Sequence, residues 1–535
     1  MFGQLKERFR GLWAPEPALK RMQLAPNEQT DNPLMLQSFT WDTLHPTLSW
    51  WQHVEQEIPR LAAMGVTQIW LPPPNKGANQ TGRGYDAYDL WDLGEFDQKG
   101  TVRTRWGTRE ELLSACATAR KHGVDVLIDA VLNHKIGADR CESALAVPVN
   151  PQNRLEETGP QRTIDAWTAF DFKGRGEKYS SLKWNQQHFS GGLRRPGSIG
   201  TTNRAKVACI GYRDLVIMDG PNMPVDKELG NYDYLLGIDI DHRHPEVRKD
   251  LLDWGVWILE TTGASGFRLD AIKHIDYRFV LEFLRHARTT LQWPGIFAVS
   301  EYWSSDLDAV LPYIKTWRGA TTFFDVPLHS NFHNASKQGA RFDLRRILDK
   351  TIVQSFPNDA YGTITFFGDV LHLKCFYHKV VGQSLESWVG AEFKLHAYAI
   401  ILLRAGGHPC VFYGDLYPNA ECGDPGVEKG LPPLIEARKR FAYGPCKDYF
   451  LERNCIGFVR LGDSKHPGCV VVLSNGKPGK SHLLRMFVGK ESANATYRAF
   501  LPGSDARITI DSRGWGSFPS SDNGVQVWVR EEFVK

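Results

Sequence analysis

The stretch GFRLDAIKH, at residues 266–274, decides how the rest of this chain is interpreted. Its apolar Phe267 and Leu269 alternate with charged residues, which is the period-two pattern of a β-strand. The predicted strand ends in a run of charged and titratable side chains, and burying them costs free energy unless they pair or perform chemistry. Two interpretations follow. Arg268 either neutralises Asp270 in a structural ion pair, or holds an ionised carboxylate at the end of a barrel strand, where barrel enzymes carry their active sites.

Similar apolar segments recur along the chain and alternate with helical patterns. Helical spacing at 48–64, for example, ends at Gly65, a typical C-terminal cap. Eight strands that alternate with helices in this way predict an α/β fold, a closed (β/α)8 TIM barrel. The predicted strands are residues 34–41, 66–74, 124–134, 266–274, 295–303, 321–329, 363–369 and 408–415.

The alternation is interrupted once, between the third and fourth predicted strands. That part of the chain is rich in Gly, Asn, Lys and aromatic residues and far exceeds the length of a βα connection, so we expect an inserted small domain after strand 3. Short alternating segments with Gly and Asn turns near the end predict a C-terminal antiparallel β-domain. The predicted divisions are 1–134 and 231–435 for the barrel, 135–230 for the inserted domain and 436–535 for a C-terminal β-sandwich.

Composition excludes several classes of function. The 64 Lys and Arg nearly balance the 61 Asp and Glu, so the chain lacks the basic field that nucleic-acid binding requires. No run of about 18 apolar residues is present, which argues against a membrane span. The first residues, MFGQLKERFRGLW, lack the apolar core of a secretory signal, and the nine scattered Cys fit reduced thiols. We therefore expect a cytoplasmic protein without nucleic-acid or membrane partners, and we expect a monomer.

Polar clusters close three of the predicted strands, at 129–134, at 268–274 and at Glu301. In a barrel, such strand ends converge on one face. One carboxylate beside Arg268, and another beside Trp303 and apolar neighbours, would have pKa values pushed apart. Glycoside hydrolysis needs that division, because one carboxylate acts as the ionised nucleophile and the other donates a proton to the leaving oxygen.

Several longer runs of the chain carry a family resemblance. They include DAVLNHKIGAD (129–139), NYDYLLGIDID (231–241), GFRLDAIKHI (266–275), AVSEYW (298–303) and GQSLESW (382–388). Through these runs the chain resembles the α-amylase family of α-glucan-active glycoside hydrolases, in particular the branch of liquefying bacterial and intracellular fungal α-amylases. WGSFP in the C-terminal region is similar to that branch as well.

The resemblance implies endo-acting, retaining cleavage of α-1,4-glucosidic bonds in starch, glycogen or maltooligosaccharides. Asp270 would be the nucleophile that forms a β-glycosyl-enzyme, and Glu301 would be the general acid and then the general base. The implied substrate-binding residues are Arg268, which would orient Asp270 and keep it ionised, His134 and His274 for sugar hydroxyls, Tyr85 for stacking on the sugar ring, and Lys273 for an adjacent sugar.

The resemblance also implies a Ca²⁺ site. Asn133, Asp233 and Asp239 would supply side-chain oxygens, and His274 would supply its backbone carbonyl. Hard oxygen ligands suit Ca²⁺, and the ion would link the barrel to the inserted domain. From its spacing alone, the run at 231–241 is more typical of a solvated acidic loop.

One segment departs from the family pattern. The family carries a third carboxylate, in an Asn-His-Asp run after the seventh strand, whereas residues 368–381 contain no such run. Aligned back from Gly382 without a gap, the Asp position holds His378, and the nearby acid is Asp369. Three explanations stay open: a non-hydrolytic relative, a displaced substitute in Asp369, or a gene-model error. If the segment is genuine, we expect severely reduced hydrolysis.

Three functions therefore fit the sequence. The first is the endo-acting α-amylase, and the second is a non-hydrolytic α-glucan-binding or regulatory protein with a retained site. A transglycosylase of the same family is the third. The third carboxylate distinguishes the first two, and the product profile identifies the last.

Overall fold

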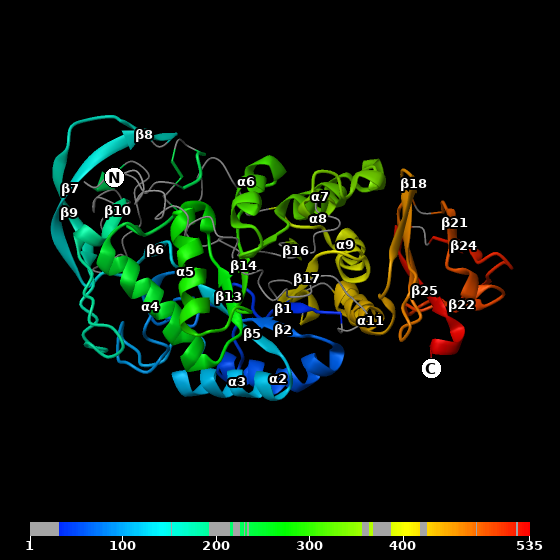
Figure 1. Cartoon of the computed structure of the whole chain (residues 1–535), viewed down its shortest axis with the longest axis horizontal. Coiled ribbons are helices and arrows are strands. Elements are labelled where there is room, and N and C mark those ends of the chain that lie inside the picture. Colours follow the sequence, from blue (N-terminus) through cyan, green and yellow to red (C-terminus); the bar gives the residue numbers. More distant parts are fainter. Residues whose placement is uncertain are drawn as a thin grey trace, which may run out of the picture.

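A computed structural model describes residues 32–150, 152–191, 215–217, 225–228, 231–232, 235–355, 363–366, 387–417, 425–477, 479–520 and 523–534. The described part is elongated (Figure 1). A sheet inserted into the barrel lies at one end, the barrel lies in the middle, and a C-terminal β-domain lies at the other end.

Eight parallel strands form a closed barrel in the order β1-β17-β16-β15-β14-β13-β5-β2. Met35 on β1 is in register with Cys410 on one side and with Gln68 on the other, which closes the ring. The predicted eight-stranded α/β barrel is confirmed. The strands are β1 (Met35–Gln37), β2 (Gln68–Trp70), β5 (Asp125–Ala130), β13 (Gly266–Leu269), β14 (Phe297–Ser300), β15 (Thr322–Phe324), β16 (Thr363–Phe366) and β17 (His408–Phe412).

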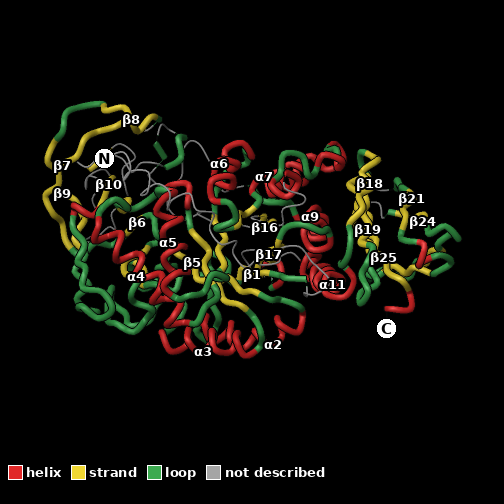
Figure 2. Tube along the Cα trace, in the orientation of Figure 1, coloured by secondary structure: helices red, strands yellow, loops and turns green. Residues whose placement is uncertain are grey.

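Helices surround these strands (Figure 2). Local sequence signals set their ends: Ser49 and Thr108 form the capping boxes of α2 and α3, and Gly65 ends α2 with a left-handed φ of 112°. The helices are α2 (Trp50–Met64), α3 (Arg109–Lys121), α4 (Pro245–Thr262), α5 (Tyr277–Thr290), α6 (Leu307–Trp317), α7 (Val326–Gln338), α8 (Ile352–Ser355), α9 (Ala391–Leu403), α10 (Tyr413–Leu416) and α11 (Pro425–Phe441).

Several strands are shorter than the sequence pattern predicts. β13 ends at Leu269, because Ala271 adopts a left-handed φ of 50° and a 3-10 turn, η2 (Ile272–His274), follows. β5 likewise ends before His134, which instead begins β6 (His134–Lys135). The loop residues at these strand ends are themselves buried, so hydrophobic periodicity does not mark where a strand stops.

The inserted small domain after the third barrel strand is confirmed as a mainly antiparallel sheet. Its strand order is β6-β12-β10-β11-β7-β8, with β9 paired to β7. β6 continues directly from the barrel and pairs with β12, where Asp239 lies opposite His134. A separate two-stranded ribbon, β3 (Lys76–Gly77) and β4 (Ala87–Asp89), follows β2. The remaining strands of the inserted sheet are β7 (Arg140–Asn150), β8 (Asn153–Glu157), β9 (Arg162–Ala169), β10 (Phe189–Gly191), β11 (Leu215–Ile217) and β12 (Ile238–Ile240).

The C-terminal region forms the predicted antiparallel β-domain. A six-stranded sheet runs in the order β18-β19-β20-β25-β22-β23, and β21 pairs with β24. α11 spans the predicted boundary at residue 436, and the domain boundaries themselves stay predictions. The strands are β18 (Cys446–Glu452), β19 (Cys455–Arg460), β20 (Cys469–Asn475), β21 (Leu483–Phe487), β22 (Thr496–Ala499), β23 (Arg507–Thr509), β24 (Trp515–Pro519) and β25 (Asn523–Arg530).

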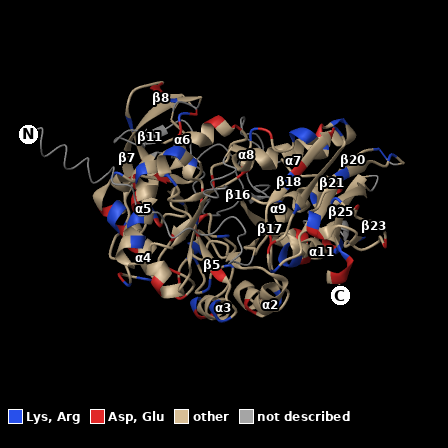
Figure 3. Cartoon of the chain, turned by 45° about the vertical axis from the view of Figure 1, so that its right-hand side comes forward, with Lys and Arg blue, Asp and Glu red and all other residues tan. Residues whose placement is uncertain are grey.

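The apolar interior of the barrel is continuous with the face of the C-terminal sheet that packs on α9. One cluster of buried apolar side chains includes both Leu34, which directly precedes β1, and Val529 on β25. Charged residues of both signs are interspersed along the outer helices (Figure 3), as the near-balanced composition implies. Among the described residues, no helix is long and apolar enough to cross a membrane.

Candidate active site

Arg268 gathers three carboxylates at the carboxyl ends of three neighbouring barrel strands. Its Nη1 lies 2.9 Å from Asp129 Oδ1 and 2.5 Å from Asp270 Oδ1, and its Nη2 lies 2.5 Å from Glu301 Oε2. The parallel register places Arg268 of β13 between Asp129 of β5 and Val299 of β14, so each strand delivers one acid to the same guanidinium. The structure therefore brings both predicted catalytic carboxylates together.

The expected separation of the two carboxylates into different environments is not what the structure shows. Asp270 was expected beside Arg268 and Glu301 beside Trp303, whereas Arg268 contacts both acids. The physical reason is the shape of the guanidinium, whose fork of donors can serve several acceptors at once. A sequence pattern identifies the arginine but does not show how its donors are shared.

Both acids are largely buried but remain accessible, with 6% of the Asp270 side chain and 10% of the Glu301 side chain exposed. Burial, followed in the same direction by the nearby Asp270 charge, raises the pKa of Glu301 to about 7 despite the attraction of Arg268. Burial also raises the pKa of Asp270, against the opposing effect of Arg268. Glu301 therefore keeps its proton over a wide pH range, which suits a group that donates one.

Asp129 is a supporting residue to which the sequence assigned no role. It is completely buried and accepts hydrogen bonds from Trp70 Nε1 at 2.9 Å and from the Tyr85 hydroxyl at 2.7 Å, besides its contact with Arg268. Its position at the start of the DAVLNH run was the available signal. The run marks a polar strand end, but only the packing shows that Asp129 supports its neighbours and does not face solvent.

Tyr85 lies at the edge of the acid cluster with 7% of its surface exposed. Its hydroxyl is bonded to Asp129, and its ring stacks on Trp41 with 5.8 Å between ring centroids and 19° between planes. Trp41, which the sequence did not single out, in turn carries the Arg83 guanidinium 4.6 Å above its ring. The tyrosine ring is thus fixed at both its hydroxyl and its face.

The two predicted sugar-binding histidines differ in how they are held. His134 Nε2 lies 2.8 Å from the Tyr85 carbonyl and its Nδ1 lies 3.4 Å from Asn133 Nδ2, so both ring nitrogens contact protein atoms. His274 Nδ1 lies 2.8 Å from the Tyr232 carbonyl. Because a carbonyl only accepts, the facing nitrogen carries the proton in each ring. Burial lowers the pKa of His134 to about 4 and that of His274 to about 3, so both are neutral at pH 7.

Lys273, predicted to contact an adjacent sugar, is held by the inserted domain. Its ammonium forms an ion pair with Glu228 and lies 4.9 Å from the ring centroid of Tyr232 and 5.7 Å from that of Tyr302. Only 3% of Lys273 is exposed. Glu228 and Tyr232 were not identified from the sequence as part of this region.

Of the residues predicted to bind Ca²⁺, the structure describes Asn133, Asp239 and His274. Asn133 and Asp239 are buried next to each other, since Ile240 N donates to the Asn133 carbonyl at 2.9 Å, while Asp233 lies outside the described residues. An amide oxygen, a carboxylate and a backbone carbonyl form a hard donor set, and a fully buried carboxylate favours a cation beside it. The donor chemistry of the described ligands fits Ca²⁺.

A second group in the described part of the chain, His188, His244 and Glu246, has ligand atoms within 4.8 Å of one another. Asn185 N–H donates to His188 Nδ1 at 3.0 Å, which leaves the proton of the neutral ring on Nε2, 3.5 Å from Glu246. A metal would need the lone pair of that protonated nitrogen. We therefore assign the group to a polar contact between the inserted domain and the start of α4.

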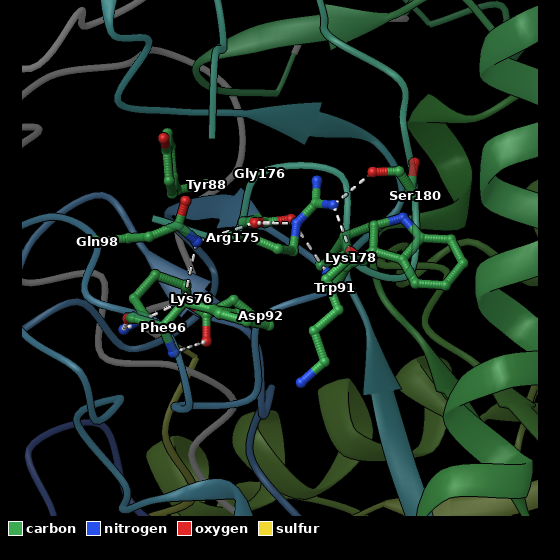
Figure 4. A network of polar contacts seen from close by, with 12 residues as sticks. Lys76, Tyr88, Trp91, Asp92, Phe96, Gln98, Arg175, Gly176, Lys178 and Ser180 are labelled. Carbon is green, nitrogen blue, oxygen red and sulfur yellow. Dashed lines mark hydrogen bonds and ion pairs between the residues drawn. The ribbon is translucent and has the colours of Figure 1, made fainter. Parts of the chain in front are cut away.

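A buried polar network holds the loop that carries Tyr85 (Figure 4). Arg175 of the inserted domain pairs with Asp89 at 2.7 Å, and Lys76 pairs with Asp92 at 3.3 Å. Gln98 Nε2 joins the two pairs, at 3.0 Å from Asp89 and 2.9 Å from Asp92. The Arg175 pair therefore ties the loop after β2 to the inserted domain, and the other contacts brace that loop internally.

The segment that departs from the family pattern, 368–381 with Asp369 and His378, lies outside the described residues. The strand before it is described only at Thr363–Phe366, as β16.

Known proteins similar to this chain include enzymes named as alpha-amylases and a maltohexaosidase, although no protein-family model matches it. The glucan 1,4-alpha-maltohexaosidase of Bacillus sp. (strain 707) is 40% identical over 502 residues, covering 94% of this chain and 93% of that protein. The alpha-amylase of Geobacillus stearothermophilus is 40% identical, covering 93% of this chain and 87% of the relative. The cytoplasmic alpha-amylase of Escherichia coli (strain K12) is 37% identical, covering 94% of this chain and 100% of that protein.

The fold is also found in solved structures. The alpha-amylase from Geobacillus thermoleovorans complexed with acarbose matches with a TM-score of 0.60 and 16% identity, covering 94% of this chain and 98% of that one. At that identity the likeness concerns the fold alone. The sequence relatives are matched over nearly their whole length, and they show that the chain belongs to the α-amylase family of glycoside hydrolases.

Proposed function

We propose that this protein is an endo-acting, retaining hydrolase of α-1,4-glucosidic bonds in starch, glycogen or maltooligosaccharides. One observation carries the proposal: Asp270 and Glu301 meet on the Arg268 guanidinium at the ends of adjacent strands, and both retain some exposure to solvent. A retaining glycosidase uses two such carboxylates, and the pKa of about 7 for Glu301 suits the one that donates a proton. The names of the full-length relatives support the same bond and substrate class.

In the proposed reaction, Glu301 donates its proton to the glycosidic oxygen as the bond to the anomeric carbon breaks. The Asp270 carboxylate attacks that carbon and forms a β-glycosyl-enzyme. Glu301, now ionised, removes a proton from a water molecule, and the resulting hydroxyl displaces Asp270 to give a product of retained configuration. Arg268 stabilises the negative charge of whichever acid is ionised at each step, since it contacts both.

Other residues would position the substrate. We propose that the fixed ring of Tyr85 stacks on the reacting sugar and that His274 accepts a hydrogen bond from a hydroxyl at its unprotonated Nε2. His134 was predicted to bind a hydroxyl directly. Because both its nitrogens contact protein atoms, we propose that it acts mainly by holding the Tyr85 backbone. Lys273 would contact the adjacent sugar from its place beside Glu228.

The proposal includes a Ca²⁺ ion held by Asn133, Asp233, Asp239 and the His274 carbonyl. Such an ion would supply structural cross-linking between the barrel and the inserted domain. The pairing of β6 with β12, which brings Asn133 and Asp239 together, supports it. We also propose the domain divisions 1–134, 135–230, 231–435 and 436–535, a monomeric state and a cytoplasmic location. An E. coli relative named as cytoplasmic is consistent with that location.

Residues 368–381 favour a second candidate function, because they lack the Asn-His-Asp run. In that case the protein binds α-glucan without turnover. Transglycosylation by the same pair of acids is a third possibility, which transfers the glycosyl group from Asp270 to a sugar hydroxyl in place of water.

The proposal is tested with maltoheptaose and the full-length protein, with the product anomer followed by NMR. We expect α-configured products from the native chain, and losses of at least about 100-fold in Asp270→Asn and Glu301→Gln. A variant carrying Phe376→Asn, Tyr377→His and His378→Asp restores the missing run and should be faster. Unchanged turnover in Asp270→Asn and Glu301→Gln would refute the assignment. Binding without turnover in the native chain would favour the second function, and sequencing the transcript across codons 360–385 would show whether the segment is genuine.

A further inference from the structure

A short segment of the inserted domain, Val225 to Glu228, contacts both loops that carry the catalytic groups. Asp226 lies at its centre. The Asp226 backbone N–H donates to the Lys273 carbonyl at 3.2 Å, and its carbonyl accepts from Tyr232 N at 2.9 Å. Its carboxylate accepts from Glu228 N at 2.9 Å through Oδ1. Asp226 is thus bonded to the loop that follows Asp270 and to its own segment.

The other carboxylate oxygen of Asp226 accepts a hydrogen bond from the Tyr302 hydroxyl. Tyr302 is only 1% exposed, and its ring packs on Tyr313 with 4.7 Å between centroids. Burial and the Asp226 carboxylate together raise the pKa of Tyr302 far above its usual range, so the hydroxyl keeps its proton and acts as the donor. The hydrogen bond joins the buried Tyr302 side chain to a half-buried carboxyl group of the inserted domain.

Tyr302 directly follows Glu301, and this places the contact one peptide unit from the general acid. The Glu301 backbone itself is held by β13 and the loop that follows it. Its N–H donates to the Leu269 carbonyl at 3.0 Å, and its carbonyl accepts from Ile272 N at 3.1 Å. The backbone before Glu301 is therefore part of the strand ladder. After Glu301 the chain leaves the barrel, and the buried Tyr302 side chain, bonded to Asp226, anchors it.

We propose that Asp226 is a positioning residue for the general acid, acting through Tyr302 and coupling the inserted domain to the catalytic pair. This inference rests on the proposed function of Glu301 as acid and base. It assigns a task to the inserted domain: the Asp226 carboxylate fixes the exit of the acid-bearing strand through Tyr302, while the Asp226 backbone N–H is bonded to the loop after the nucleophile.

The charged and titratable groups around Glu301 determine how its pKa would respond to the loss of the hydrogen bond between Tyr302 and Asp226. Arg268 and Asp270 come from β13 and its end, Asp129 approaches through Arg268 from β5, and His329 of α7 packs on Trp303. None of these is removed when Asp226 is replaced. A looser backbone at Tyr302 would admit water to the Glu301 carboxyl, and its pKa would fall from about 7 toward its ordinary value of 4.5.

The test compares Asp226→Ala, Asp226→Asn and Tyr302→Phe in the full-length protein. Asp226→Ala and Tyr302→Phe should lower kcat for maltoheptaose by about 10- to 100-fold, because small displacements of catalytic groups are costly. KM should change little. The alkaline limb of the pH profile should move to lower pH. The double variant Asp226→Ala with Tyr302→Phe should have a kcat no lower than that of Asp226→Ala alone. Asp226→Asn keeps an acceptor for Tyr302 and should restore most of the rate and the pH profile.

Asp306→Ala is the matched control, since Asp306 is an exposed acid that caps α6 in the same loop. It should leave kcat and the pH profile unchanged. A fall in thermal stability of Asp226→Ala with native kcat and native pH limb would overturn the inference, because a purely structural contact predicts that result.

If the native chain proves inactive, the proposed function fails and the inference is judged without turnover. Hydrogen–deuterium exchange of the peptide spanning 297–307 should then be faster in Asp226→Ala and Tyr302→Phe than in the native chain. Exchange that is unchanged in both would overturn the positioning role.

Discussion

The Arg268 guanidinium and the Asp129 carboxylate form an ion pair of 2.9 Å in which neither side chain has any surface exposed to solvent. Removing two charges from water is costly, and good hydrogen-bond geometry must offset the cost. Here Trp70, Tyr85 and Arg268 all donate to Asp129. Asp129 therefore fixes the arginine that the two proposed catalytic acids, Asp270 and Glu301, share.

We predict that Asp129→Ala lowers the free energy of unfolding by about 3–5 kcal/mol, because it leaves the buried Arg268 without one of its partners. Urea denaturation measures the effect. Asp42→Ala is the matched control, since Asp42 also pairs with an arginine but 53% of its side chain is exposed. That surface pair should contribute about 1 kcal/mol or less. Equal losses in the two variants would contradict the prediction.

The raised pKa of Glu301 predicts the pH dependence of activity. Glu301 must be protonated to donate, so kcat/KM should fall as the pH rises through about 7. Glu301→Gln should abolish this limb and lower kcat by about 10²–10⁴ on maltooligosaccharides. The loss should be much smaller on a nitrophenyl maltooligosaccharide, whose leaving group needs no proton. An alkaline limb near pH 7 that persists in Glu301→Gln would assign the titration to another group.

His408 predicts an acid sensitivity of the fold. It is completely buried at the start of β17, and within the described part of the chain neither ring nitrogen has a hydrogen-bond partner. Burial, with Arg438 nearby, lowers its pKa to about 3 from 6.5. The unfolded chain therefore binds a proton below pH 6.5 that the folded chain does not. Stability from this group is present above pH 6.5 and declines as the pH falls toward 3.

At pH 5 the loss amounts to about 2 kcal/mol relative to pH 7, from the displacement of the pKa. His408→Leu should remove that part of the pH dependence, measured as the difference in denaturation free energy between the two pH values. His122→Leu, at an exposed position after α3, should leave the difference unchanged. A pH dependence identical in native protein and His408→Leu would rule out this source.

The buried pair of Arg175 and Asp89 predicts that arginine and lysine are not interchangeable here. Arg175 donates to Asp89 through Nε and to the Lys178 and Ser180 carbonyls through Nη1. A lysine keeps the charge but loses the fork of donors, so Arg175→Lys should lower the melting temperature and speed hydrogen exchange across 170–184. Lys178→Ala removes an exposed pair with Glu95 and should do neither.

The proposed Ca²⁺ site predicts that a chelator lowers the melting temperature and that added Ca²⁺ restores it, because an ion bound only by the folded state stabilises it. Asp239→Asn should weaken the response, since one charged ligand becomes neutral. Mg²⁺ should restore less, because it prefers a tighter octahedral shell. A melting temperature insensitive to chelator in the native chain would exclude a stabilising ion.

Local signals in the sequence predicted much of the architecture. The glycine at 65, a C-terminal cap that acts over a few residues, ends its helix where expected. Barrel strands are buried on both faces, so their apolar runs were also visible. The ends of the strands were not, because Ala271 and His134, which lie beyond those ends, are buried too.

The sequence by itself determined which residues are candidates for the chemistry: the charged end of the 266–274 run, Glu301 and the polar cluster at 129–134. Those groups are recognisable because their residue types are costly to bury without a purpose. Only the tertiary structure decided how they are shared. One arginine contacts three acids, Asp226 reaches Tyr302 from the inserted domain, and Trp41 stacks on Tyr85. Contacts between residues far apart in the chain depend on the relative placement of whole elements, which no local pattern encodes.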